Sequence, residues 1–141
     1  MDDSRADKES QVDTSGERMY VEVLRKPVFD KDHAPPLEGV REFTINHLFA
    51  NVWSRSNNDV IGQTINLRER RLITIALLAA QGRSDQLTEH VSGARKAGLA
   101  EAELLELMIH VAHCAGWAAG SSGQTIVQRI FKGMDDVSPV S

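Results

Sequence analysis

Apolar residues recur at three- and four-residue spacings along most of this chain, which is the period of an amphipathic helix. No strand pattern competes with it. Residues 1–17 are charged and polar without any period, which predicts a disordered tail, and residues 135–141 form a second tail. We therefore expect one all-α domain over residues 18–134. The predicted helices cover residues 37–53, 67–81, 85–97, 100–115 and 122–131, and residues 19–24 form a short helix or an extended arm.

Capping residues and glycines mark the ends of these helices. Asn66 is followed three residues later by Glu69, as in a capping box, and Ser84 is expected to cap the next helix. Gly82, Gly98 and Gly116 are expected to end helices. Residues 72–80 are apolar all round, so we expect them at the centre of the fold or of an oligomer. In the following helix the expected buried stripe consists of Leu87, Val91 and Ala94.

Composition narrows the functional class. A net charge of -4 and a pI near 5.7 argue against a nucleic-acid partner. No apolar run has membrane-spanning length, and the first residues carry no secretory h-region, so we expect a cytoplasmic protein without a membrane partner. A single cysteine excludes a disulfide within the chain.

Three of the five histidines lie in two predicted helices. Imidazole is the side chain best suited to move protons near neutral pH. His90 shares one helix face with Arg83 and Gln86, and this face opens at a helix N-terminus, where free N–H groups favour an anion. The functional interpretation is a substrate carboxylate held by Arg83, with His90 as proton donor or acceptor. The alternative is a core histidine beside a solvated arginine.

The second histidine-bearing helix carries His110 and His113. Glu106, His110, His113 and Trp117 are spaced by four, three and four residues, so they share one face if the helix continues past Gly116. We interpret this face as a polar wall of the same pocket, with Trp117 as an apolar lid. The alternative is a surface Glu106–His110 pair with an interface tryptophan.

The same histidines and Cys114 are also candidates for metal binding and thiol catalysis. His90, His110 and His113 together offer zinc ligands, but no carboxylate accompanies them in a recognised ligand spacing, so we expect no metal. Cys114 is either a nucleophile activated by the neighbouring histidines or a small buried hydrophobe. Trp53 is most simply a core residue, and it is also a candidate substrate contact.

The stretch from Phe49 to about Val127 resembles the carboxymuconolactone decarboxylase family. The resemblance rests on Val52-Trp53-Ser54-Arg55, residues 67–80, Gly82-Arg83, Gln86-Leu87, His90, Ala94, Gly98 and His110-Val111-Ala112-His113-Cys114-Ala115-Gly116-Trp117. It implies a single-domain helical bundle of the alkylhydroperoxidase D-like type, which assembles as a trimer or hexamer. The best-known members decarboxylate 4-carboxymuconolactone to an enol-lactone of 3-oxoadipate without a cofactor.

This chain departs from two patterns of that family. The alkylhydroperoxidase D branch has a Cys-x-x-Cys pair at the positions of Arg83 and Gln86 and a glutamate at that of Arg71, so thiol peroxidase chemistry lacks its nucleophile and its resolving cysteine. Related decarboxylases often read His-Tyr-Ala-Gly-Trp-Pro, where this chain has Cys114 in place of tyrosine and Ala118 in place of proline. Both changes are expected beside the substrate.

Together these features predict a cofactor-independent decarboxylase of a small, anionic, unsaturated lactone. Arg83 and the helix end would bind the carboxylate, His110 or His113 would donate to the developing enolate oxygen, and His90 would protonate carbon. The remaining candidate substrate contacts are Gln86, Trp117, Cys114 and Trp53. The rival interpretations are a same-fold isomerase, cyclase or lactone-opening enzyme, and a non-catalytic oligomeric ligand-binding protein.

Overall fold

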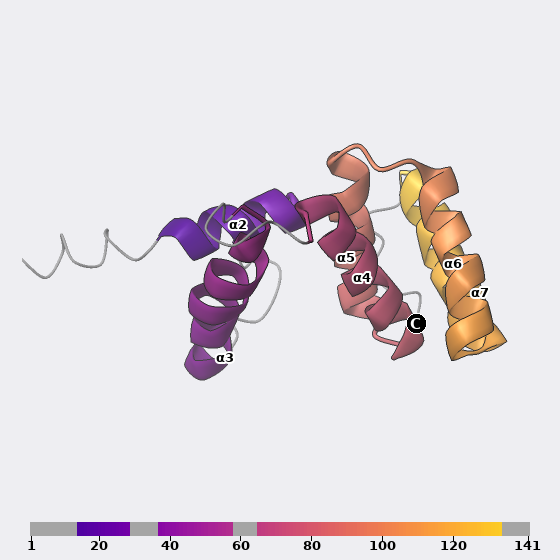
Figure 1. The fold of residues 1–141 in the computed structure, drawn as a ribbon, viewed down its shortest axis with the longest axis horizontal. Coiled ribbons are helices and arrows are strands. Elements are labelled where there is room, and N and C mark those ends of the chain that lie inside the picture. Colours follow the sequence, from indigo (N-terminus) through magenta and orange to yellow (C-terminus); the bar gives the residue numbers. More distant parts are fainter. Residues whose placement is uncertain (1–13, 29–36, 58–64, 134–141) are drawn as a thin grey trace, which may run out of the picture. The chain divides into compact units, whose positions relative to one another are not determined.

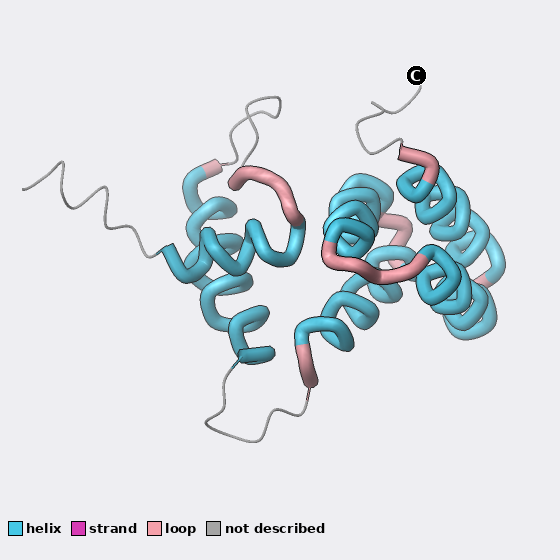
Figure 2. Tube along the Cα trace, turned by 90° about the horizontal axis from the view of Figure 1, so that it is seen from above, coloured by secondary structure: helices cyan, strands magenta, loops and turns pink. Residues whose placement is uncertain are grey.

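The computed structural model describes residues 14–28, 37–57 and 65–133, and every regular element in these ranges is a helix (Figures 1 and 2). The predicted all-α class is confirmed for this part of the chain. The chain divides into two compact units, one of Met1–Glu22 with Lys26–Gln63 and one of Val23–Arg25 with Thr64–Ser141. The predicted boundary at residue 18 lies inside a helix, and that at residue 134 lies outside the described residues. The single domain over 18–134 therefore stays a prediction.

Helix α2 (Thr14–Leu24) settles one alternative left open by the sequence. Residues 19–24 are helical rather than extended, and the helix begins at Thr14, within the expected tail. The rest of that tail, residues 1–13, lies outside the described residues, as does the tail over 135–141.

The first unit continues with a helical run of α3 (Glu38–Glu42), the π-helix η1 (Phe43–Val52) and the 3-10 turn η2 (Trp53–Asn57). The predicted helix over 37–53 is therefore confirmed, although it extends into residues expected to be loop. The buried residues are spaced by four: Ile45, Phe49 and Trp53. Tyr20 lies edge-on to Phe49, and Phe49 stacks on Trp53 with ring centroids 6.1 Å apart.

Not every apolar residue of this run is buried. Val40, Phe43 and Leu48 are exposed. From Phe43 on the run is a π-helix, in which N–H groups bond five residues back, as the Trp53 N–H does to the Leu48 carbonyl. Its wider turn brings residues four to five apart onto one side, and Phe43 and Leu48 fall outside the buried series of Ile45, Phe49 and Trp53.

The second unit is a bundle of α4 (Leu67–Ala80), α5 (Ser84–Lys96), α6 (Glu101–Ala115) and α7 (Trp117–Phe131). Helices α6 and α7 lie side by side in both views (Figures 1 and 2), and α4 also packs on each of them. Helix α5 packs on α4 and α7. The core consists of Ile75, Ala79, Leu87, Val91, Ala94, Leu99, Leu104, Met108, Val111, Ile126, Val127 and Ile130.

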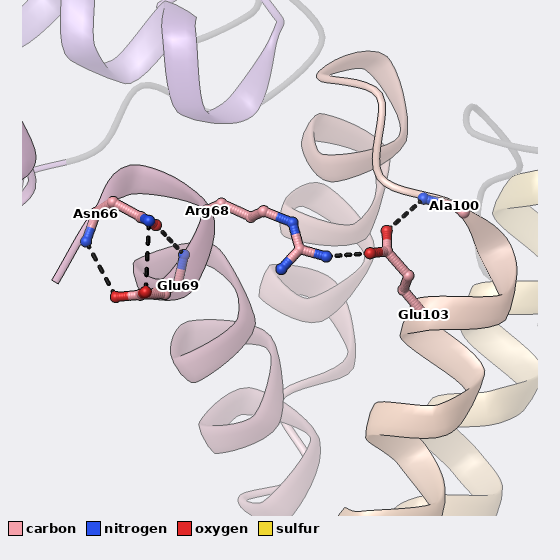
Figure 3. Close-up of polar contacts among 5 residues, drawn as sticks. All are labelled: Asn66, Arg68, Glu69, Ala100 and Glu103. Atoms are coloured by element: carbon pink, nitrogen blue, oxygen red, sulfur yellow. Dashed lines mark hydrogen bonds and ion pairs between the residues drawn. The ribbon is translucent and has the colours of Figure 1, made fainter.

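Helix ends follow the local signals with one exception. Asn66 caps α4: its side chain accepts from the Glu69 N–H at 2.8 Å, and Glu69 accepts from the Asn66 N–H at 3.2 Å (Figure 3). The prediction that Ser84 caps α5 was wrong. Arg83 occupies the N-cap position, no side chain caps the helix, and Ser84 is its first residue.

Helix α4 is not buried on all sides. Arg71, Ile75 and Ala79 face the core, whereas Ile73 and Leu77 are about half exposed, at 45% and 54%. A position for residues 72–80 at the centre of the subunit is therefore wrong, because the remaining helices cover only one side of α4. Burial of its outer face in an oligomer stays a prediction. No helix in the described ranges is long and apolar enough to cross a membrane.

Gly116 separates α6 from α7 with a φ of 111°, a conformation that favours glycine. Helix α7 therefore begins at Trp117, earlier than the predicted residue 122. Two glycines let these helices pack closely: a Cβ at Gly120 would lie 2.7 Å from the Met108 carbonyl oxygen, and one at Gly123 would lie 2.3 Å from Met108 Sδ.

Candidate active site

The first half of the predicted site lies on α5. Arg83 and Gln86 are exposed at the beginning of the helix, and His90 is half-buried two turns from Arg83, beside the buried Leu87 and Val91. The Ser84 N–H donates to the Gly82 carbonyl at 3.1 Å. Because no side chain caps α5, the N–H groups of Asp85 and Gln86 remain available to an anion at the positive end of the helix dipole. Asp85 in the first turn opposes part of that positive potential. This face combines a guanidinium, a helix N-terminus and a partly dehydrated imidazole.

The second half lies on α6, and its side chains are exposed. His113 Nδ1 lies 2.8 Å from the Ile109 carbonyl oxygen, so Nδ1 carries the proton of the neutral ring and Nε2 is left as its basic nitrogen. His110 Nε2 lies 3.5 Å from Cys114 Sγ. Cys114 is exposed, which corrects the interpretation of it as a small buried hydrophobe.

Trp117 does not continue the α6 face. The helix ends before Gly116, so the condition for placing Trp117 on one face with His110 and His113 is not met. Trp117 is the first residue of α7 and is 77% exposed. Its predicted role as a lid thus has no support from helix spacing.

An open hollow of about 390 Å³ lies between α4 and α6. Leu72 and Leu107 supply apolar walls, and the other lining residues are Arg68, Glu103, Glu106 and His110. The hollow thus includes the predicted polar pair Glu106 and His110. It does not include His90, Arg83 or Gln86.

Two of the residues that line this hollow form an ion pair. Arg68 of α4 pairs with Glu103 of α6, which also accepts from the Ala100 N–H at 3.0 Å (Figure 3). The Ala100 N–H, assisted by the Arg68 guanidinium, holds the pKa of the Glu103 carboxyl below its ordinary value. Because Arg68 is engaged in this pair, the hollow offers an anion little uncompensated positive charge.

The predicted histidines lie on two helices, α5 and α6, whose main contacts are with α4 and α7. Helix α5 packs mainly on α4 and α7, and α6 packs on the same two helices, so the main contacts do not bring α5 and α6 together. Trp53 belongs to the other compact unit, where it is 3% exposed and stacked on Phe49, as its core interpretation predicted. No three His, Cys, Asp or Glu side chains among the described residues are grouped to hold a metal ion.

The sequence patterns do not predict two polar contacts of α4. The Arg68–Glu103 pair joins residues 35 apart, so no local pattern points to it. Arg71 is 2% exposed, and its Nη1 donates to the Val23 carbonyl. Its place in the buried series Arg71, Ile75 and Ala79, spaced by four, is a signal that the sequence does contain.

Comparison with known proteins gives a consistent result. The model of the Carboxymuconolactone decarboxylase family matches residues 47–123, a span that takes in more than half of the chain and every predicted site residue. The chain is also 30% identical over 92 residues to a 4-carboxymuconolactone decarboxylase of Acinetobacter baylyi (strain ATCC 33305 / BD413 / ADP1). That similarity covers 65% of this chain and 63% of the bacterial protein, which is less than two thirds of its length. The chain belongs to the carboxymuconolactone decarboxylase family.

Proposed function

We propose that this protein is a cofactor-independent decarboxylase of a small, anionic, unsaturated lactone resembling 4-carboxymuconolactone. The observation that carries the proposal is the α5 face: Arg83 at an uncapped helix N-terminus and a half-buried His90 on the same side. Family membership and the similarity to a named decarboxylase support the same reaction class.

The α5 N-terminus suits the binding of the leaving carboxylate. Arg83 supplies a guanidinium that pairs with both carboxylate oxygens, and the first N–H groups of the helix add dipolar stabilisation. Gln86, one turn further, can donate to a lactone oxygen. This arrangement orients the bond between the ring carbon and the carboxylate next to the His90 imidazole.

Proton transfer by His90 completes the reaction. When the carbon–carboxylate bond breaks, its electron pair delocalises into the conjugated carbonyl, and carbon dioxide leaves. A proton from the His90 imidazolium is then transferred to the carbon of the enolate, which gives the enol-lactone product, and a proton from the solvent restores the imidazolium. A hydrogen-bond donor near the enolate oxygen lowers the barrier further, a role that we assign to His110 or His113.

We further propose that the chain works as a homo-oligomer, a trimer or hexamer. Arg83 and Gln86 are exposed in one subunit, whereas loss of a charged carboxylate as neutral carbon dioxide is favoured in a site with little water. His110 and His113 are exposed on α6. A second copy that sets its α6 face against α5 would exclude water and bring both kinds of histidine to the substrate.

Product analysis tests the reaction. Purified protein is incubated with 4-carboxymuconolactone without added metal or cofactor, and the products are followed by mass spectrometry and by carbon dioxide release. The expected product is lighter than the substrate by one carbon dioxide. A product of unchanged mass would indicate the rival isomerase or cyclase, a gain of one water would indicate lactone opening, and saturable binding without turnover would indicate the non-catalytic rival. Each of these three outcomes contradicts the proposal.

A further inference from the structure

Arg71 is the one charged side chain that is buried among the described residues. A guanidinium removed from water is costly unless hydrogen bonds satisfy it, so a buried arginine calls for a structural or functional reason. The mechanism above makes no use of this residue. Its surroundings suggest what it does.

The Arg71 Nη1 group donates to the carbonyl of Val23, which lies 48 residues earlier in the chain. Val23 and Leu24 are themselves buried, at 0% and 3% exposed, and they belong to the compact unit that contains α4 to α7. Arg71 therefore holds a short segment of the early chain against the helical bundle.

The same carbonyl lies against α5. A Cβ at Gly93 would stand 2.2 Å from the Val23 oxygen and 3.0 Å from the Leu24 Cα, so a larger residue would displace backbone atoms. The Val23 carbonyl is thus held between Arg71 on α4 and Gly93 on α5. Both neighbours are required: one donates a hydrogen bond, and the other leaves room.

Gly93 lies three residues after His90, and residues three apart share one face of a helix. The backbone of Val23 and Leu24 therefore crosses α5 about one turn from His90 and follows the same face as Arg83 and Gln86. It forms the end of that face farthest from the helix N-terminus.

We propose that Arg71 is a positioning residue: its guanidinium fixes the Val23–Leu24 backbone against Gly93, and this backbone sets one end of the His90 site. The inference rests on the proposed function. It assigns Arg71 no contact with the substrate. A small displacement of a positioning group can reduce turnover by as much as about 100-fold, because reacting atoms must be held in a near-attack geometry.

The test compares Arg71→Met, Arg71→Lys, Gly93→Ala and the double variant Arg71→Met/Gly93→Ala. We expect Arg71→Met to lower kcat about 10- to 100-fold with a smaller change in KM, since the substrate-binding groups at the α5 N-terminus remain. Arg71→Lys should recover part of the loss, because lysine donates one hydrogen bond without the planar fork. The double variant should be no worse than the more impaired single variant, because both changes release the same carbonyl.

Hydrogen–deuterium exchange supplies a readout that needs no substrate. Amides of residues 23–25 and 90–93 should exchange faster in Arg71→Met and Gly93→Ala, while those of α6 and α7 stay at the wild-type rate. Matched controls are Arg70→Met on the same helix and Gly39→Ala, where a Cβ meets nothing within 4 Å. Neither control should change kcat or exchange at residues 90–93.

Failure of the inference and failure of the proposed function give different results. If the wild type turns over substrate and folded Arg71→Met retains its kcat, the positioning role is wrong. If no variant, wild type included, releases carbon dioxide, the proposed reaction is wrong. The positioning of the Val23–Leu24 backbone by Arg71 is then judged by hydrogen–deuterium exchange alone, and unchanged exchange at residues 23–25 and 90–93 in Arg71→Met overturns it. Should Arg71→Met not fold, Arg71→Lys and Gly93→Ala decide by the same criteria.

Discussion

His90 lies where α5 passes from its buried stripe to its polar face, next to Leu87 and Val91 and on the side of Arg83. This border position gives an imidazole both a partly dehydrated environment and access to a ligand. A core histidine would be fully buried, and a surface histidine fully exposed; His90 is neither. Its half-burial is the residue-scale observation that favours a role in proton transfer.

We therefore predict that His90→Gln lowers kcat/KM for decarboxylation of the substrate by about 100- to 10,000-fold, the usual contribution of a positioned general acid. The measurement is steady-state turnover, with circular dichroism to verify the fold. His47→Gln is the matched control, because His47 is exposed in the other compact unit and has no assigned role. A His90→Gln variant that keeps wild-type turnover would remove His90 from the mechanism.

Residues differ in how well the sequence predicts their partners. The Asn66–Glu69 cap and the stripe of Leu87, Val91 and Ala94 were predicted because neighbours within two turns decide them. The partners of Arg68 and Arg71 lie 35 and 48 residues away, and helical periodicity carries no information about such pairs. Periodicity also gives the inward face of a helix without telling which two faces meet, so a pocket shared by His90 and His110 stays a prediction.

At the scale of elements, the contact between α6 and α7 depends on two glycines that differ in what surrounds them. A Cβ at Gly120 would meet backbone, the Met108 carbonyl oxygen at 2.7 Å, as well as the Ala112 side chain. A Cβ at Gly123 would meet the Met108 side chain, with Sδ at 2.3 Å. Backbone yields only if a whole helix shifts, whereas a methionine side chain can change rotamer.

Gly120→Ala should thus destabilise the protein more than Gly123→Ala. Overpacking costs about 1–3 kcal/mol, and replacing a helical glycine by alanine returns about 1 kcal/mol. We expect a net loss of about 1–2 kcal/mol for Gly120→Ala and a change near zero for Gly123→Ala, measured by urea unfolding. Equal losses would mean that Met108 cannot adapt and that its side chain is as fixed as the backbone.

The stability that the Arg68–Glu103 ion pair gives the fold, between the first turns of α4 and α6, should depend on pH. The Ala100 N–H and Arg68 lower the pKa of Glu103 in the folded state, so the carboxylate stabilises the fold at a pH above its unfolded value of about 4.3. This stabilisation is lost as the pH falls through the folded pKa. Glu103→Gln should therefore lower the urea midpoint at pH 7 and have a smaller effect at pH 3, because more of the wild-type carboxyl is protonated there.

Glu106→Gln is the matched control for that experiment, since Glu106 is also exposed on α6 and lies one turn from Glu103. In Glu106→Gln, the difference between the urea midpoints at pH 7 and pH 3 should be the same as in the wild type. If Glu103→Gln lowers the midpoint equally at both pH values, its effect comes from packing and not from the ionised carboxylate.

At the scale of the whole molecule, the two candidate faces, on α5 and α6, have no described cavity in common. The α5 face has the positive end of its helix and Arg83, whereas the α6 face has the negative end of its helix and Glu106. Exposed apolar groups accompany the second face, with Ile109 at 53% and Trp117 at 77%. Opposite charge and exposed apolar area are what two copies need in order to bind through these faces.

Subunit mixing tests whether a site is built from two copies. His90→Ala and His110→Ala are each expected to be poorly active alone. If α5 of one subunit faces α6 of another, an oligomer reassembled from equal amounts of both variants contains some sites with both histidines, roughly a quarter under random heterologous pairing. Turnover should then rise to about that fraction of the wild-type value, and light scattering should show the same oligomer for all samples.

The control mixture pairs His90→Ala with the double variant His90→Ala/His110→Ala, in which no subunit supplies His90, and it should regain nothing. A site contained within one subunit predicts no recovery in either mixture, because each chain still lacks one histidine. Full activity of His110→Ala alone would assign the oxygen-binding role to another donor. If turnover recovers in the first mixture but not in the control mixture, His90 and His110 must act on one substrate from different copies. No rearrangement within a single chain can restore a histidine that the chain lacks.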